Sequence, residues 1–238
     1  MGREVAIETT AGAVCAWRAE PLAPARGAVV VVQEIFGVNA HIRAVAERYA
    51  AEGMLTLAPA LFDPVERGVE LGYDPAGIAR GRELAAALGF EPAIGIVLAC
   101  ARHLAQEGHR VGLLGFCWGG TVALLAGLRG PLPTVVYYGG RSAPFLQAMT
   151  AEQRGNAAAT PLLLHFGEHD ALIPPEHRDL HRSVLPHADI HTYPAGHGFN
   201  CEQRQDFDAV AAQAAHVRSV QFFHRHLASV SPSPGLDR

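Results

Sequence analysis

The sequence has no long apolar run and no excess of basic residues. Its 238 residues carry a formal net charge of −4, so it lacks the positive field that a general nucleic-acid-binding protein needs. Its apolar runs are shorter than a membrane span, and its first residues lack the apolar stretch of a signal peptide. We therefore expect a cytoplasmic protein that binds neither nucleic acid nor a membrane.

Cysteine is scarce, and the four cysteines lie far apart at positions 15, 100, 117 and 201. None belongs to a C-x-x-C motif, which argues against a disulfide framework and a zinc ribbon and fits a reducing compartment. We expect structural roles for Cys15 and Cys100.

Histidine is more abundant, with 13 residues, and two pairs have a spacing of four: His165 with His169, and His177 with His181. The first pair flanks a strand end and a turn rather than one helix face, and no third ligand is evident near the second, so we expect no metal site.

Strand-like and helix-like segments alternate along the chain. The valine-rich run 28–33 is typical of a strand that is buried on both faces of a parallel sheet. Other expected strands cover 54–58, 111–116, 134–138, 161–166 and 189–193, with a hairpin over 4–9 and 13–18. Expected helices follow a cap at Asn39 to about 52, and cover 76–88, 93–106, 121–127, 174–185 and 205–227.

This order predicts an α/β protein with a doubly wound, mostly parallel sheet flanked by helices. We expect a single domain over residues 1–238, in which 229–238 form a flexible tail.

The run VGLLGFCWGG, residues 111–120, places Cys117 between a predicted strand and a predicted helix. A free cysteine is more often a small buried hydrophobe than a reactive group. Here, however, Gly115 and Gly119 stand two residues on either side, which is the G-x-S-x-G nucleophile elbow with sulfur in place of the hydroxyl. Such an elbow holds its central residue at a helix N-terminus, where a thiolate is favoured.

Asp170 and His197 follow two later strands, in loops at the carboxyl ends where functional groups gather in such sheets. Either residue alone could be an ordinary loop residue. Together with Cys117 they have the order nucleophile, acid, histidine that is typical of an α/β-hydrolase triad. In this interpretation His197 takes the thiol proton and later activates water, and Asp170 orients the imidazole.

Glu34 comes directly after the valine strand, where a carboxylate is costly unless it is exposed or paired. Because this strand should neighbour the elbow strand, we expect Glu34 beside Cys117. The loop after it supplies an oxyanion-hole donor in this fold, so the backbone N–H groups of Ile35 and Trp118 are our candidates.

Four motifs together resemble the dienelactone hydrolase (carboxymethylenebutenolidase) family: QEIFGVN from 33, GFCWGG from 115, GEHD from 167 and GHGF from 196. The resemblance covers nearly the whole chain. It implies an α/β-hydrolase fold, a triad of Cys117, His197 and Asp170, and no cofactor. It also implies that Glu34 contacts the resting thiol and keeps it neutral until substrate displaces the carboxylate. The family's reaction opens an enol-lactone to a dicarboxylic product.

The sequence departs from that family at residues that bind the substrate. Well-known members hold the substrate carboxylate with two arginines, one of them four residues after the catalytic histidine. Here that position is Cys201, and Arg204 follows three residues later. The other arginine corresponds to Arg80 or Arg82, and the neighbour of the histidine is Gly198 rather than serine.

We expect substrate contacts from two phenylalanines and three arginines: Phe36, Phe199, Arg80, Arg82 and Arg204. The leading hypothesis is therefore a cysteine-dependent hydrolase of a small lactone or ester. The first alternative is a broader carboxylesterase or thioesterase on the same triad, with neutral esters preferred. A second is a non-catalytic, hydrolase-like scaffold that binds a ligand, and a third is a redox sensor, for which no resolving cysteine is evident. We expect a monomer or a small homo-oligomer.

Overall fold

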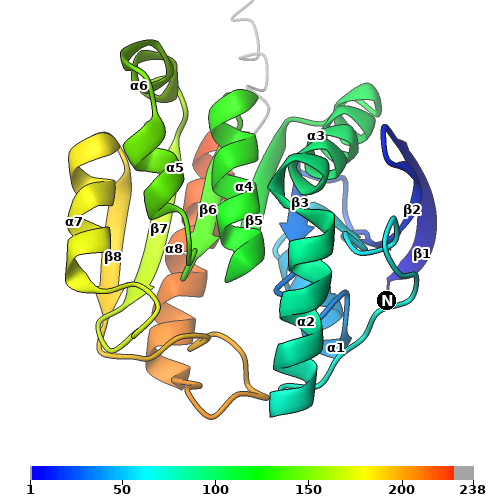
Figure 1. Ribbon diagram of the computed structural model, residues 1–238. Coiled ribbons are helices and arrows are strands. Elements are labelled where there is room, and N and C mark those ends of the chain that lie inside the picture. Colours follow the sequence, from blue (N-terminus) through cyan, green and yellow to red (C-terminus); the bar gives the residue numbers. More distant parts are fainter. Residues whose placement is uncertain (1, 228–238) are drawn as a thin grey trace, which may run out of the picture.

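A computed structural model describes residues 2–227 and contains one eight-stranded sheet (Figure 1). The strands are β1 Arg3–Thr9, β2 Gly12–Ala19, β3 Ala28–Val32, β4 Leu55–Pro59, β5 Val111–Phe116, β6 Thr134–Tyr137, β7 Leu162–Gly167 and β8 Asp189–Tyr193. Their order is β1-β2-β4-β3-β5-β6-β7-β8. Strands β1 and β2 pair in antiparallel fashion, β2 is antiparallel to β4, and the other pairs are parallel. The predicted fold class is confirmed, while the predicted tail lies outside the described residues.

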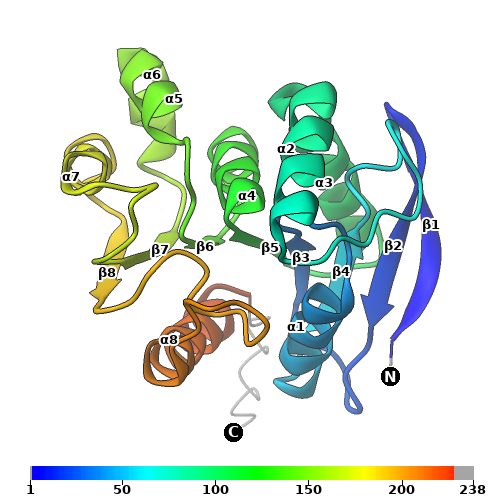
Figure 2. The same ribbon diagram turned by 60° about the horizontal axis from the view of Figure 1, so that its bottom comes forward.

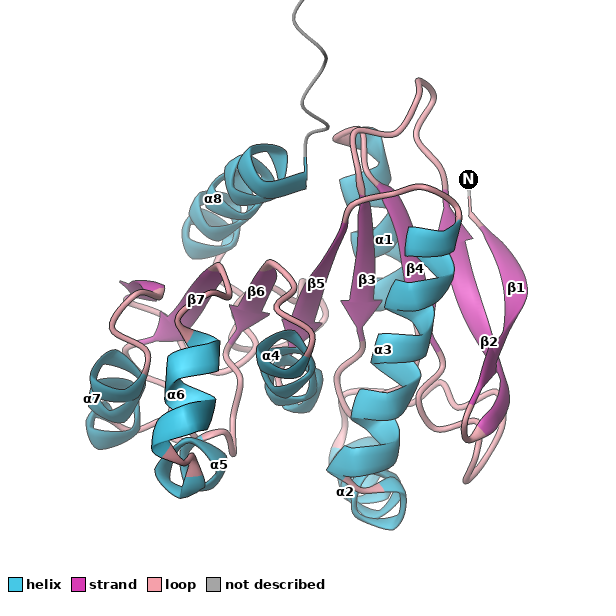
Figure 3. Ribbon diagram, turned by 90° about the horizontal axis from the view of Figure 1, so that it is seen from above, coloured by secondary structure: helices cyan, strands magenta, loops and turns pink. Residues whose placement is uncertain are grey.

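Helices cover both faces of the sheet. They are α1 Ala40–Ala51, α2 Pro75–Leu88, α3 Phe90–Gln106, α4 Trp118–Arg129, α5 Ala143–Ala148, α6 Ala151–Ala157, α7 Pro175–Val184 and α8 Ala209–Leu227. Helices α1 and α8 lie on one face, and α3, α4, α6 and α7 lie on the other (Figures 2 and 3). Every residue of β3 and β5 is buried, as expected for central strands with helices on both sides.

Capping side chains set the start of several helices. Asn39 accepts a hydrogen bond from the Ile42 N–H at 3.2 Å, which confirms the predicted cap of α1. Asp208 accepts one from the Ala211 N–H at 2.8 Å, so α8 begins four residues later than the apolar pattern predicts. Helices α5 and α6 were not predicted, because six and seven residues are too few to show a helical period.

The elbow depends on two glycines that let strand and helix pass closely. A Cβ atom on Gly119 would collide with the Gln33 carbonyl oxygen at the end of β3, and one on Gly115 would collide with the carbonyl oxygen of Gly119. The start of α4 is thereby held against the ends of β3 and β5. This contact fixes where the residue between β5 and α4 lies.

No single helix of the described chain is long and apolar enough to cross a membrane. Helices α2 and α3 pass the same test of length and composition only as a pair, bent by 83°.

Candidate active site

Cys117 occupies the turn between β5 and α4 in a strained conformation. Its φ of 53° and ψ of −122° lie in a region that L-residues rarely adopt. The Cys117 carbonyl accepts a hydrogen bond from the Gly120 N–H at 3.0 Å, so the first turn of α4 follows the thiol directly. The sulfur therefore lies at the positive end of a helix.

Two further polar side chains complete a hydrogen-bonded chain with this thiol. His197 Nε2 lies 3.1 Å from Cys117 Sγ, and His197 Nδ1 lies 2.8 Å from Asp170 Oδ2. Asp170 follows β7 and His197 follows β8, so both come from the carboxyl edge of the sheet. The three residues, which span 81 positions of the sequence, are therefore linked by hydrogen bonds in the order nucleophile–histidine–acid that a triad requires.

Charge stabilises the protonated form of this histidine. Burial by itself lowers the pKa of His197, but the Cys117 thiolate and the Asp170 carboxylate outweigh it and raise the pKa to about 10. Asp170 is held in place because its other oxygen, Oδ1, accepts the Leu172 N–H at 2.8 Å. His197 therefore stays in its imidazolium form at neutral pH.

A cavity of about 190 Å³ opens beside Cys117 and His197. Its apolar lining is made by Ile35, Phe36, Ile78, Ala85, Trp118 and Leu172. Three arginines also line it: Arg82, Arg141 and Arg204. A space of this size and lining fits a small ligand with an apolar body and a negative group.

Ile35 and Trp118, the predicted oxyanion-hole residues, both line this cavity. Within the described residues, neither backbone N–H donates a hydrogen bond to another protein group. Both N–H groups are therefore free to donate to a ligand.

Glu34 does not form the predicted contact with the thiol. Its side chain is buried, and Oε1 accepts a hydrogen bond from Arg204 Nη1 at 3.2 Å. Burial raises the pKa of Glu34, and the Arg204 guanidinium opposes this rise. Among the hydrogen bonds of residues 2–227, Cys117 Sγ pairs with His197 instead.

The predicted substrate residues divide into two groups. Phe36, Arg82 and Arg204 line the cavity, and the Arg204 guanidinium lies 5.9 Å from the centre of the Phe36 ring. Arg80 is absent from the lining, because it lies on an exposed part of α2 and pairs with Glu66 and Glu83.

Phe199 also fails to reach the cavity. It is fully buried, and its ring packs 5.3 Å from that of Tyr138. The sequence analysis missed Arg141, a non-glycine residue with a φ of 70°. The only signal for it was its place shortly after the end of β6, on the functional edge of the sheet.

The sequence profile of the dienelactone hydrolase family matches residues 14–227. The chain belongs to this family. A carboxymethylenebutenolidase of Pseudomonas putida is 31% identical over 203 residues, which cover 82% of this chain and 84% of that protein. A Synechocystis sp. protein with a provisional carboxymethylenebutenolidase name is 33% identical over 227 residues, which cover 90% and 92% of the two chains.

Solved structures show the same fold. A provisionally named dienelactone hydrolase of Klebsiella pneumoniae superposes with a TM-score of 0.78 at 28% identity, covering 94% of this chain and 98% of that one. A dienelactone hydrolase-like promiscuous phosphotriesterase from metagenomic libraries superposes with a TM-score of 0.76 at 21% identity. The match covers 96% of this chain and 99% of that one. As a member of the dienelactone hydrolase family, the protein is a hydrolase that acts on ester or lactone bonds.

Proposed function

We propose that Cys117, His197 and Asp170 form the catalytic triad of a hydrolase that opens a small lactone or ester through an acyl-enzyme. The observation that carries this proposal is the continuous chain of hydrogen bonds from Sγ through the imidazole to the Asp170 carboxylate. A nucleophile, a base within hydrogen-bond reach and a group that orients the base are the parts that such chemistry requires.

The first half of the reaction transfers the acyl group to sulfur. His197 holds the thiol proton, and the Cys117 thiolate attacks the carbonyl carbon to form a C–S bond. The carbonyl π electrons move to oxygen, which the N–H groups of Ile35 and Trp118 stabilise. When the carbonyl re-forms, the C–O bond breaks and the leaving oxygen takes the proton from His197.

The second half returns the enzyme to its starting state. His197 removes a proton from water, and the resulting hydroxide attacks the thioester carbon. Collapse of this intermediate breaks the C–S bond and releases a carboxylic acid, while the thiolate–imidazolium pair re-forms. In a lactone the leaving oxygen stays attached, so one ring-opened product leaves the site.

The three cavity arginines support a substrate that carries a carboxylate besides the bond that is cleaved, because arginine binds carboxylates through paired hydrogen bonds. The apolar remainder of the lining supports the alternative, a broader esterase or thioesterase that turns over neutral esters. The proposal also places the protein in the cytoplasm, where thiols are kept reduced.

The test is steady-state hydrolysis of a dienelactone and of a neutral p-nitrophenyl ester. We expect wild type to turn over the lactone, Cys117→Ala to be inactive, and Cys117→Ser to keep at most a trace. Cys100→Ser is the matched control, since Cys100 is buried in α3 away from the cavity. Substantial turnover by Cys117→Ala would refute the triad. Ester turnover without lactone turnover would keep the triad and change only the proposed substrate class.

A further inference from the structure

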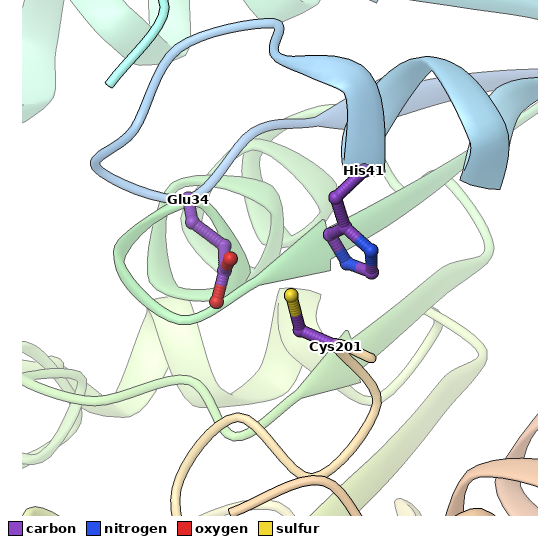
Figure 4. Close-up of side chains that lie close together, drawn as sticks. All are labelled: Glu34, His41 and Cys201. Carbon is purple, nitrogen blue, oxygen red and sulfur yellow. The ribbon is translucent and has the colours of Figure 1, made fainter. Parts of the chain in front are cut away.

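A second group of chemically reactive side chains lies buried next to the triad and takes no part in the proposed reaction. Glu34, His41 and Cys201 each offer one ligand atom, and these atoms all lie within 4.8 Å of one another. Figure 4 shows the Cys201 sulfur between the Glu34 carboxylate and the His41 ring. The three come from the loop after β3, the first turn of α1 and the loop after β8.

Two atoms of these side chains are buried without a hydrogen-bond partner among the described residues. These atoms are Glu34 Oε2 and His41 Nε2. Glu34 is 0% exposed and His41 is 7% exposed. A buried polar atom that lacks a hydrogen-bond partner destabilises the folded protein. Two such atoms beside one thiol suit a ligand that accepts an electron pair from each.

We propose that Glu34, His41 and Cys201 bind a single first-row divalent cation, with Zn²⁺ as the metal that fits best. Carboxylate, imidazole and thiolate are the three donor types that proteins use for Zn²⁺. Bond lengths of about 2.0–2.3 Å place tetrahedral ligand atoms roughly 3.3–3.7 Å apart, so the side chains, whose ligand atoms lie within 4.8 Å of one another, need to close by at most about 1.5 Å. The fourth position is left for water.

Charge and neighbouring hydrogen bonds agree with this assignment. The Glu34 carboxylate and the Cys201 thiolate bring two negative charges to the metal, and Arg204, which stays bonded to Glu34 Oε1, leaves the cluster with one net positive charge. Asn39 Nδ2 donates to the Tyr73 hydroxyl at 3.1 Å, which leaves the Tyr73 proton free for the Cys201 sulfur or the Glu34 carboxylate beside it. Such outer contacts orient metal ligands.

The experiment uses the full chain with Cys117→Ala, which removes the other thiol–imidazole pair and all turnover. Metal-free protein is titrated with Co²⁺ while the near-ultraviolet thiolate-to-cobalt absorption is recorded, and Zn²⁺ is then added as a competitor. We expect one bound equivalent, a thiolate band, and displacement by one equivalent of Zn²⁺. Metal analysis after equilibrium dialysis with Zn²⁺ gives an independent stoichiometry.

Four variants in the same background assign the ligands. Cys201→Ser should abolish the band and His41→Gln should weaken binding, while Tyr73→Phe should lower the Co²⁺ affinity about 10–100-fold. Cys100→Ser should change nothing. Circular dichroism and thermal unfolding of the metal-free variants establish that each is folded. A thiolate-to-cobalt band that persists in Cys201→Ser would overturn the proposal, and so would the absence of a bound equivalent of Co²⁺ in the Cys117→Ala protein. Neither result bears on the proposed triad.

Discussion

The Arg204 guanidinium lies 3.2 Å from the Glu34 carboxylate, although 170 residues separate them in the sequence. Arg204 also lines the cavity beside Cys117, whereas the Glu34 side chain is almost completely shielded from solvent. One guanidinium therefore neutralises a buried carboxylate and faces the substrate space. The pair explains how a carboxylate is tolerated at the end of a strand that is buried on both faces.

We expect Arg204→Met to lower the free energy of unfolding by about 3 kcal/mol, because it leaves the buried Glu34 charge without its partner. The double variant Glu34→Gln/Arg204→Met should recover most of that loss. Urea unfolding of both single variants and the double variant, with a metal chelator present, measures the coupling. Effects that simply add would show that the two groups do not interact.

The pKa of His197, raised to about 10, sets a pH dependence for alkylation of Cys117. A raised pKa means that the imidazolium is present at pH 7 and is lost as the pH rises through about 10, so the positive charge beside Sγ persists across neutral pH. We expect the rate of alkylation by iodoacetamide to change only about twofold between pH 6.5 and 8.5. An unperturbed thiol would change about fiftyfold.

In His197→Asn the steep dependence of an ordinary thiol should return. Glu34→Gln is the comparison, and it should stay close to wild type because Glu34 bonds Arg204 rather than the sulfur. A steep profile in the wild-type protein would mean that the resting thiol is neutral.

The cavity arginines predict a difference between acidic and neutral substrates. Arg82→Gln and Arg141→Gln should each raise KM for a carboxylate-bearing lactone about tenfold or more, since a hydrogen bond to a charged group contributes about 1.5–3 kcal/mol. KM for a neutral ester should stay nearly constant. Arg80→Gln is the matched control, because Arg80 lies on α2 like Arg82 but outside the cavity. Equal effects on both substrates would mean that the arginines do not bind a carboxylate.

Gly119→Ala tests the close packing at the elbow. The added methyl group would meet the Gln33 carbonyl oxygen, and we expect the free energy of unfolding to fall by about 1–3 kcal/mol, with a loss of turnover. Gly155→Ala in α6 provides the control, since nothing lies within 4 Å of its Cβ position and alanine favours a helix. Urea unfolding compares the two variants, and a neutral Gly119→Ala would show that the start of α4 can move away from the end of β3.

The sequence predicts those parts of the molecule that depend on local pattern. The valine run of β3, the Asn39 cap and the glycines around Cys117 each act over a few residues, and the structure contains all three. The approach of Cys117, Asp170 and His197 is also predictable, because parallel strands deliver their following loops to one edge of a sheet.

Partnerships across that edge are not predictable from spacing. Nothing in the sequence indicates that Glu34 pairs with Arg204 instead of Cys117, since both neighbours lie at the same edge and their side-chain directions decide the contact. Arg80 and Arg82 are only two positions apart on α2, and the rotation of that helix places Arg82 in the cavity and Arg80 outside it. Cys201 was noticed only as a departure from the family, and its position beside His41 needed the fold.

The loop that follows β8 also restricts which insertions and deletions this protein can tolerate. Within eight residues it carries His197, Cys201 and Arg204, which face the thiol, the proposed cation and the substrate cavity respectively. Inserting or deleting one residue there would displace several of these groups at once. The described side chains of segment 143–157, by contrast, do not line the cavity, so length variation should accumulate there when the protein is diversified by laboratory evolution.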